Sequence, residues 1–134
     1  METLNRVQPY ILSVLRIIVG LLFMQHGLSK LFGFPAGAGF PTFLSLPWFE
    51  GCIEMIGGGL IVVGLSTRFA AFITSGEMAI AYFMVHAPKS FFPYVNRGDL
   101  VVLFCFVFFY LVFAGAGPIS LDALLWKKER SSAR

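Results

Sequence analysis

Apolar residues form long runs along the chain, separated by short polar segments or by segments rich in glycine and proline. Four of these runs have the length of a membrane-spanning helix, and we place the helices at about residues 10–31, 48–65, 67–86 and 98–115. Each is close to the roughly 20 residues that a helix needs to cross about 30 Å of hydrocarbon. The pattern therefore predicts an all-α membrane protein, a four-transmembrane-helix antiparallel bundle forming a single domain over residues 1–134.

The connections between the predicted helices follow from the helix breakers. The uncharged stretch from Leu31 to Phe49 contains three glycines and three prolines, so we expect a loop there, with its phenylalanines at the membrane interface. A second loop is expected at 86–97. The short Ser66–Arg68 link predicts an antiparallel hairpin between the second and third helices. The tail at 118–134 is expected to be an amphipathic segment on the anionic inner leaflet, or else a frayed, solvated end.

The composition indicates that lipid is the solvent of this chain. Hydrophobic residues make up 57% of it and charged residues 13%, about half the roughly 25% that is usual in soluble domains. The net charge of +3 is small and dispersed, so no nucleic-acid partner is expected. Cys52 and Cys105 have no zinc-like or redox spacing, so we expect neither a disulfide nor a metal site, and we take both as small buried apolar residues.

With four crossings, both termini share one side of the membrane, and the distribution of Lys and Arg sets which side. Six such residues fall on the side of the termini and three on the other: Arg6, Arg68, Lys127, Lys128, Arg130 and Arg134 against Lys30, Lys89 and Arg97. This predicts cytoplasmic N and C termini in a bacterial cytoplasmic (inner) membrane. The first helix lacks a signal-peptide cleavage site, so we expect it to remain in the protein.

Ionisable residues lie inside three of the predicted spans: Arg16, His26, Lys30, Glu50, Glu54 and Glu77. Each costs at least about 2.5 kcal/mol at mid-bilayer unless it is paired or faces an internal cavity. At 100° per residue they share stripes with small residues, so we expect them to face the bundle interior. The stripe of the third helix comprises Ala70, Thr74, Glu77, Ala81 and Met84.

Depth and side-chain direction predict that these charges form two layers. An Arg16–Glu77 pair is expected in the inner half of the membrane, and a group of Glu54, His26 and Lys30 in the outer half. Two interpretations remain open. The charges either fix the register of the helices as structural pairs, or they line a polar pocket that opens to the outer side.

The outer loops add four candidates, Trp48, Tyr94, Asn96 and Asp99. The aromatic residues are suited to stacking on a ring ligand, whereas Asn96 and Asp99 are expected to cap the start of the last helix. His26 and His86 both lie near the outer face, but the Glu-x-x-His repeat of di-metal bundles is missing, so haem and metal are not expected. Gln25 lies opposite the polar stripe and is a candidate contact with another subunit.

Three motifs carry a family resemblance: Arg16-x3-Gly20-x2-Phe23-x3-Gly27-x2-Lys30, Glu54-x2-Gly57-Gly58-x-Leu60-x3-Gly64-x2-Thr67, and Gly115-Ala116-Gly117-Pro118-Ile119-Ser120-Leu121-Asp122. Together they resemble the DoxX family of small four-helix membrane proteins, over roughly residues 13–125. The chain departs from the family at Arg97-Gly98-Asp99, where a Gly-Gly-Glu-like turn is frequent. The family takes its name from a subunit associated with a terminal quinol oxidase and thiosulfate:quinone oxidoreductase.

The resemblance implies a membrane subunit of an oxidoreductase, and an accessory subunit more readily than an independent enzyme. A quinone is the implied ligand, with His26 or Glu54 exchanging its proton. No covalent cofactor is expected, because the chain has no dinucleotide, haem or iron–sulfur motif, so a partner subunit would bring the redox centre. The alternatives are a small oligomeric transporter or channel lined by Arg16, Glu54 and Glu77, and a non-catalytic assembly or scaffold protein.

Overall fold

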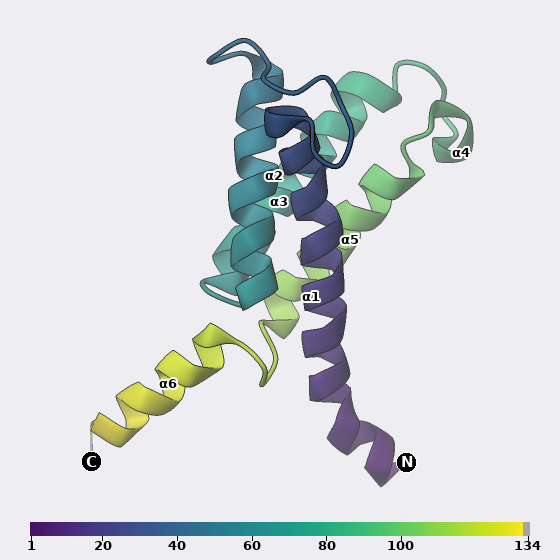
Figure 1. The fold of residues 1–134 in the computed structure, drawn as a ribbon. Helices are drawn as coiled ribbons and strands as arrows, with labels where there is room; N and C mark the ends of the chain where they lie inside the picture. The colour runs from purple at the N-terminus through teal and green to yellow at the C-terminus, as the bar shows by residue number, and fades with distance from the viewer. Residues whose placement is uncertain (133–134) are drawn as a thin grey trace.

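The computed structural model describes residues 1–132, and all of the regular secondary structure in that range is helical. The long helices are α1 (Glu2–Phe32), α2 (Leu46–Val63), α3 (Thr67–Ala81) and α5 (Asp99–Ala114), shown in Figure 1. Two short elements lie between α3 and α5: η1, a π-helical turn at Tyr82–His86, and α4 (Pro93–Asn96). The last helix, α6 (Leu121–Ser132), follows the bundle.

Three of these helices are long and apolar enough to cross a membrane: Glu2–Phe32, Leu46–Val63 and the continuous α3–η1 segment Thr67–His86. The fourth, α5, is a shorter apolar helix of 16 residues, about 24 Å long. Large apolar side chains cover the outside of the helices, among them Phe69, Phe106 and Phe113. Such a surface suits lipid and not water. The chain is therefore a multi-pass helical membrane protein in contact with the bilayer.

The predicted helices are all present, but their ends differ from the prediction. α1 begins at Glu2 because the helix continues through the polar residues that precede the apolar run, with Pro9 inside it. The predicted loop between the first two helices is present, and it begins at Gly33, whose φ of 68° suits glycine. α4 is an additional turn within the segment predicted as a loop at 86–97, and α6 makes part of the tail helical.

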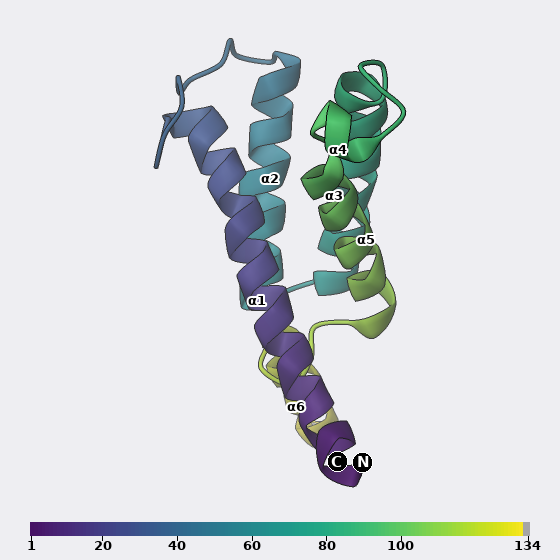
Figure 2. The ribbon, with the colours of Figure 1, turned by 90° about the vertical axis from the view of Figure 1, so that its right-hand side faces the viewer.

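The long helices pack as two antiparallel pairs, α1 with α2 and α3 with α5 (Figure 2). Glycines allow the close approach of α1 and α2: a Cβ on Gly27 would lie 2.5 Å from the Met55 amide nitrogen, and one on Gly58 would lie 2.8 Å from that of Met24. This is the small-residue packing typical of membrane helices. The short α2–α3 turn then joins one pair to the other.

The core lies between the two pairs and consists of Phe23, Ile61, Ala70, Ala71, Met78, Phe104, Phe108 and Leu111. Phe23 of α1 bridges the pairs, because its ring centroid is 5.4 Å from that of Phe104 and 4.7 Å from that of Phe108 on α5. Edge-to-face contacts of this kind add to the stabilisation from burial. These three rings fix the separation of the pairs at mid-bundle.

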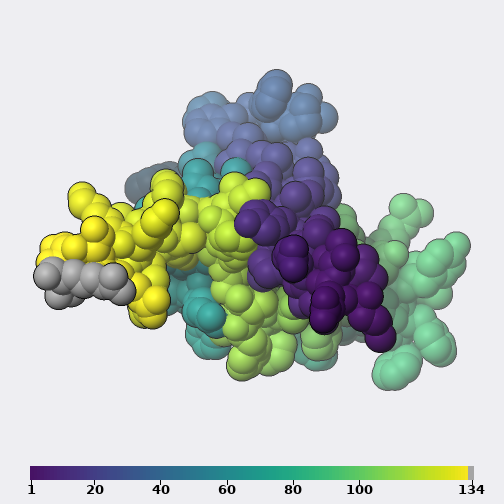
Figure 3. All heavy atoms as spheres, turned by 90° about the horizontal axis from the view of Figure 1, so that it is seen from below, coloured from purple at the N-terminus to yellow at the C-terminus, as the bar shows by residue number. Residues whose placement is uncertain are grey.

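Both termini and the α2–α3 turn lie at one end of the bundle, which we call the termini end, and the connections 33–45 and 87–98 lie at the other, the loop end (Figure 1). At the termini end α6 projects sideways from the bundle, and none of its described residues is buried (Figure 3). Arg134, one of the basic residues expected on the side of the termini, lies outside the described residues.

Candidate functional site

A cluster of three charged side chains joins α1 to α2 at the loop end. Lys30, in the last turn of α1, donates hydrogen bonds from Nζ to Glu50 Oε2 at 3.1 Å and to Glu54 Oε1 at 2.9 Å. Glu50 and Glu54 lie one turn apart on the same face of α2. Glu54 is buried, with 4% of its surface exposed, whereas Lys30 and Glu50 are partly exposed. The expected contact between Lys30 and Glu54 is present, and Glu50 joins it.

A cavity of about 320 Å³ lies beside this cluster, and we call it the loop-end pocket. One wall comes from α1 and α2 and carries the polar groups His26, Lys30, Glu50 and Glu54. The facing wall comes from α3, η1 and α5 and is apolar except for His86. Phe23 and Phe104 lie at the base, and the His26 ring packs edge-on against Phe104 at 5.9 Å. The pocket thus combines a charged wall with aromatic and aliphatic surfaces.

Two carboxylates near the pocket have free hydrogen-bonding capacity. Glu54 Oε2 and both carboxylate oxygens of Glu77 are buried and have no hydrogen-bond partner among residues 1–132. Glu77 comes from α3, and its charged neighbours are Glu54, Lys30 and Glu50. Buried polar atoms are nearly always paired, so these oxygens mark a place where a proton, a water molecule or a ligand is required. Glu77 therefore belongs to the charges of the loop end.

The predicted ion pair between Arg16 and Glu77 is wrong. Arg16 is fully buried, but its Nη2 donates to the Ile119 carbonyl at 2.5 Å, and the acidic side chain in its surroundings is Asp122. Arg16 packs against Gly64, at the level where α3 begins. Glu77 lies ten residues further along α3, about 15 Å away along the bundle. Arg16 therefore holds the segment after α5 at the termini end, far from the pocket.

The structure places the four candidates from the outer loops in different surroundings. Trp48 packs against Phe43 and Phe49, each with ring centroids 5.1 Å away. Tyr94 is 87% exposed, and Asp99 is exposed in the first turn of α5. Asn96 is 2% exposed, and its backbone oxygen lies 3.0 Å from Nδ1 of His86, a residue of the pocket wall. The structure thus brings Asn96 next to the pocket, while the other three lie outside its lining.

The π-helical turn η1 changes which residues of the third span face the pocket. The Ala87 amide donates to the Tyr82 carbonyl, an i→i+5 bond that inserts one extra residue into the turn. With regular α-helical spacing, His86 would point about 140° away from Ala81. Instead, Ala81 and His86 both line the pocket. The placement of Met84 on the inward stripe is wrong for the same reason, since Met84 is 58% exposed.

Metal ligands do not gather at this site. Within the part of the chain that the structure describes, no three His, Cys, Asp or Glu side chains are grouped so as to hold a metal ion. Cys52 and Cys105 are free and half-buried, so they are less buried than expected. The lining of the pocket consists of hydrogen-bonding, aromatic and aliphatic side chains.

The fold and the pocket define a class: a small multi-pass helical membrane protein with a charged, half-enclosed cavity at one end of its bundle. The profile of the DoxX family matches residues 11–87. An uncharacterized protein of Haemophilus influenzae is 41% identical to this chain, with 96% of the chain and 100% of that protein covered. The chain belongs to the DoxX family.

Two further relatives are similar to the chain. A protein named "Putative oxidoreductase CatD", from Bacillus subtilis, is 28% identical, with 88% of this chain and 89% of that protein covered. A second uncharacterized protein of Haemophilus influenzae is 30% identical over 55% of this chain and 49% of its own length. No solved structure matches the chain.

Proposed function

We propose that the protein is a four-span accessory subunit of an oxidoreductase system in a bacterial cytoplasmic membrane, and that its loop-end pocket binds a quinone-type ring. The observation that carries the proposal is one cavity that combines an aromatic base with a charged wall, whose buried Glu54 has an Oε2 atom with no partner among residues 1–132. Membership of the DoxX family and similarity to "Putative oxidoreductase CatD" support the link to oxidoreductases.

The fourth crossing is inferred from the contacts of α5. At the termini end, Arg68 Nη1 donates to the Val112 carbonyl at 2.6 Å, and near the middle Ser75 Oγ donates to the Cys105 carbonyl at 2.8 Å. At the loop end, Gly98 packs against Tyr82. Because α5 follows the third span from end to end, it spans the same depth of membrane as that helix.

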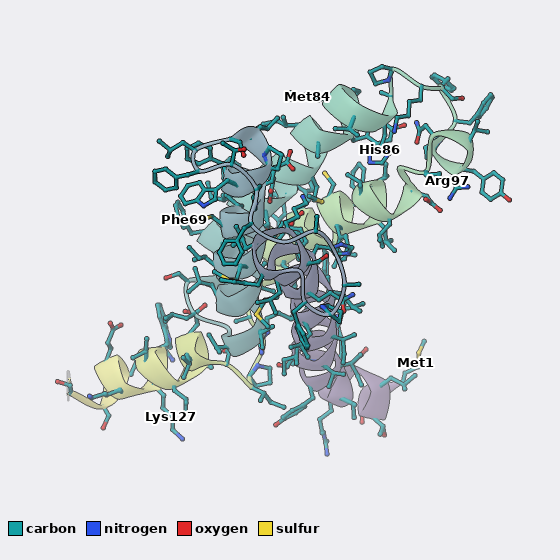
Figure 4. The ribbon with its side chains drawn as sticks, turned by 45° about the horizontal axis from the view of Figure 1, so that its top comes forward. Met1, Phe69, Met84, His86, Arg97 and Lys127 are labelled. Atoms are coloured by element: carbon teal, nitrogen blue, oxygen red, sulfur yellow. The ribbon has the colours of Figure 1, made fainter. Side chains whose placement is uncertain are left out.

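The orientation is inferred from the basic residues. Five of those described lie at the surface of the termini end: Arg6, Arg68, Lys127, Lys128 and Arg130. At the loop end are Lys30, Lys89 and Arg97, and Lys30 is compensated by two carboxylates. Figure 4 shows Lys127 at one end and Arg97 at the other. The positive-inside rule then directs the termini to the cytoplasm and the loop-end pocket to the outer half of the membrane.

The size and chemistry of the pocket suit one ring. Its volume of about 320 Å³ lies near the lower end of the roughly 300–1,000 Å³ found for small-molecule sites. Phe23 and Phe104 offer aromatic surface for stacking. Lys30 keeps a third proton to donate to a ring oxygen, and Glu54 Oε2 is free to accept from a ring hydroxyl. A bound quinone supplies the two-electron chemistry, and the chain orients the ring and exchanges its protons.

Direct binding measurements test this function. We expect purified protein in lipid nanodiscs to bind a short-chain benzoquinone or its hydroquinone saturably. Glu54→Gln should weaken binding of the hydroquinone about 10-fold or more, because its hydroxyl donates to the Glu54 carboxylate and a hydrogen bond to a charged group contributes roughly 1.5–3 kcal/mol. Glu129→Gln, on the exposed face of α6, is the matched control and should bind like the wild type.

Three results would contradict the proposal or redirect it. The absence of saturable binding of either ring form by the wild type would overturn it. Ion or solute flux in liposomes that Glu77→Gln abolishes would favour a transporter. Co-purification of a partner subunit without ring binding would favour an assembly role.

A further inference from the structure

We propose that His86 is a second ligand-contacting residue of the loop-end pocket, that it presents Nε2 as a hydrogen-bond acceptor, and that the pocket therefore prefers a ring with hydroxyl groups over the same ring with carbonyl groups. The inference rests on the proposed function, from which it takes the class of ligand, a quinone-type ring. It adds a residue, a direction of hydrogen bonding and a preferred oxidation state. His86 faces Lys30 and Glu54 from the opposite helix pair.

The position of His86 is fixed by the packing of η1 on the start of α5. A Cβ on Gly98 would lie 2.7 Å from Cε2 of Tyr82 and 2.9 Å from Cβ of His86, so the lack of a side chain there permits the contact. The rings of Tyr82 and His86 stack at 6.3 Å with an interplanar angle of 17°. His86 consequently lies between the end of the third span and the first turn of α5 (Figure 4).

The hydrogen bond of His86 determines its tautomer. His86 Nδ1 lies 3.0 Å from the Asn96 backbone oxygen. A carbonyl oxygen can only accept, so Nδ1 carries the hydrogen, and in the neutral ring Nε2 is then an acceptor. The imidazole therefore offers an acceptor to the cavity that it lines.

Asn96 is the positioning residue for this arrangement. Its Oδ1 accepts from the Gly98 amide at 2.8 Å, and its Nδ2 donates to the Ser90 carbonyl at 2.9 Å and to the Tyr82 hydroxyl at 3.2 Å. The side chain is 2% exposed, with both of its polar atoms paired. Asn96 thus fixes the turn that carries the backbone oxygen bonded by His86.

Acceptors predominate among the free polar groups of the pocket. The Lys30 ammonium uses two of its three protons on Glu50 and Glu54. Glu54 Oε2 is left unpaired on one wall, and His86 Nε2 is an acceptor from the other. His26 offers one donor and one acceptor in either neutral tautomer, so it leaves this balance unchanged. A dihydroxy ring donates toward both walls, whereas a dione only accepts and leaves both acceptors unpaired.

Paired binding measurements test the preference. The probes are a decyl-substituted benzoquinone and its hydroquinone, each added without oxygen to the full chain in lipid nanodiscs. We expect the wild type to bind the hydroquinone about 3- to 10-fold more tightly, the effect of one hydrogen bond. His86→Phe should reduce this difference, because it removes one of the two free acceptors and leaves Glu54 Oε2. His26→Phe, the matched control from the opposite wall, should keep the difference.

A ligand-free measurement keeps the inference testable even where His86→Phe fails to fold. In protein with ¹⁵N-labelled histidine, the two-bond proton–nitrogen spectrum should show His86 as the Nδ1–H tautomer, and Asn96→Ala should shift it toward a mixture. Equal affinities in the wild type, an undiminished preference in folded His86→Phe, or an Nε2–H tautomer would overturn the role of His86 and leave the proposed function intact. Failure of both probes to bind would overturn the proposed function, and the ring preference with it.

Discussion

At the scale of single residues, Lys30 compensates two carboxylates with one ammonium group. Glu54 is 4% exposed, whereas Glu50 and Lys30 remain partly accessible. Partly exposed ion pairs contribute little to stability, but a buried charge that loses its partner is strongly destabilising. Of the two ion pairs of Lys30, the one with Glu54 is therefore the one that matters for the stability of the α1–α2 pair.

Lys30→Met tests that dependence. The substitution leaves Glu54 buried without a counter-charge, so we expect it to lower the free energy of unfolding by about 3–5 kcal/mol. Adding Glu54→Gln to Lys30→Met removes the unpaired charge and should recover most of that loss. Denaturant unfolding in detergent micelles measures both effects, and Lys127→Met on α6 is the neutral control. A wild-type unfolding midpoint for Lys30→Met, or a double variant as unstable as the single one, would contradict the prediction.

The sequence allows the charged cluster to be predicted, but it does not allow the hydrogen-bond partner of Arg16 to be predicted. Lys30, Glu50 and Glu54 lie on inward stripes of two helices joined by one loop, so helical spacing brings them together. Arg16 instead bonds the carbonyl of Ile119, 103 residues away in the chain. Charge-pairing rules assign an arginine to a carboxylate, and no spacing rule identifies a backbone oxygen in a distant connecting segment.

At the scale of helices, glycines decide how closely α1 and α2 approach. A Cβ on Gly27 would meet the Met55 amide nitrogen at 2.5 Å and the Gly51 carbonyl oxygen at 2.7 Å. Both neighbours are backbone atoms of α2, so no side-chain rotation can relieve the contact. Gly76 on α3 is a natural comparison, because a Cβ there would meet no heavy atom within 4 Å.

Replacing each of these glycines by alanine separates packing from helix propensity. Gly27→Ala should force α1 and α2 apart and destabilise the protein by about 1–3 kcal/mol, as overpacking does. Gly76→Ala should be neutral or stabilising by up to about 1 kcal/mol, because alanine favours the helical backbone. Thermal unfolding of the two variants under the same conditions measures the difference. If Gly27→Ala were as stable as Gly76→Ala, the close approach of α1 and α2 would not limit stability.

Helical periodicity predicted the inward faces of the spans as far as Ala81 and failed beyond it. Up to that point each hydrogen bond joins residues four apart, which is the condition behind 100° per residue. At η1 the bond from the Ala87 amide to the Tyr82 carbonyl breaks that condition, so Met84 turns outward and His86 turns toward the pocket. Residue composition alone does not predict a π-helical turn, and its residues Tyr82 and His86 pack on Gly98, which is distant in helical register.

At the scale of the molecule, hydrogen bonds between helices hold the termini end together, and the loop end encloses the pocket. Asp122 accepts hydrogen bonds from the Ser66 and Thr67 amides at 2.7 and 2.9 Å, so the start of α6 caps α3. Arg68 binds the last carbonyls of α5. With the bond between Arg16 and Ile119, these bonds link α1, α3, α5 and the start of α6 at one end, while at the other end the two pairs diverge (Figure 2). The bundle is thus held together at the termini end and contains a cavity at the loop end.

The proposed placement of that cavity in the outer half of the membrane depends on the topology, including the crossing of the bilayer by α5, which cysteine labelling tests. Lys89 precedes α5 and Ser131 follows it, and both are exposed. In a background with Cys52→Ala and Cys105→Ala, we expect a membrane-impermeant maleimide to label Lys89→Cys in intact cells, but Ser131→Cys only after permeabilisation. Removing Lys89 takes a positive charge from the outer side, so it strengthens the bias that orients the chain. Labelling of both sites from outside would contradict the crossing of α5, and the reverse pattern would place the loop-end pocket in the cytoplasmic half.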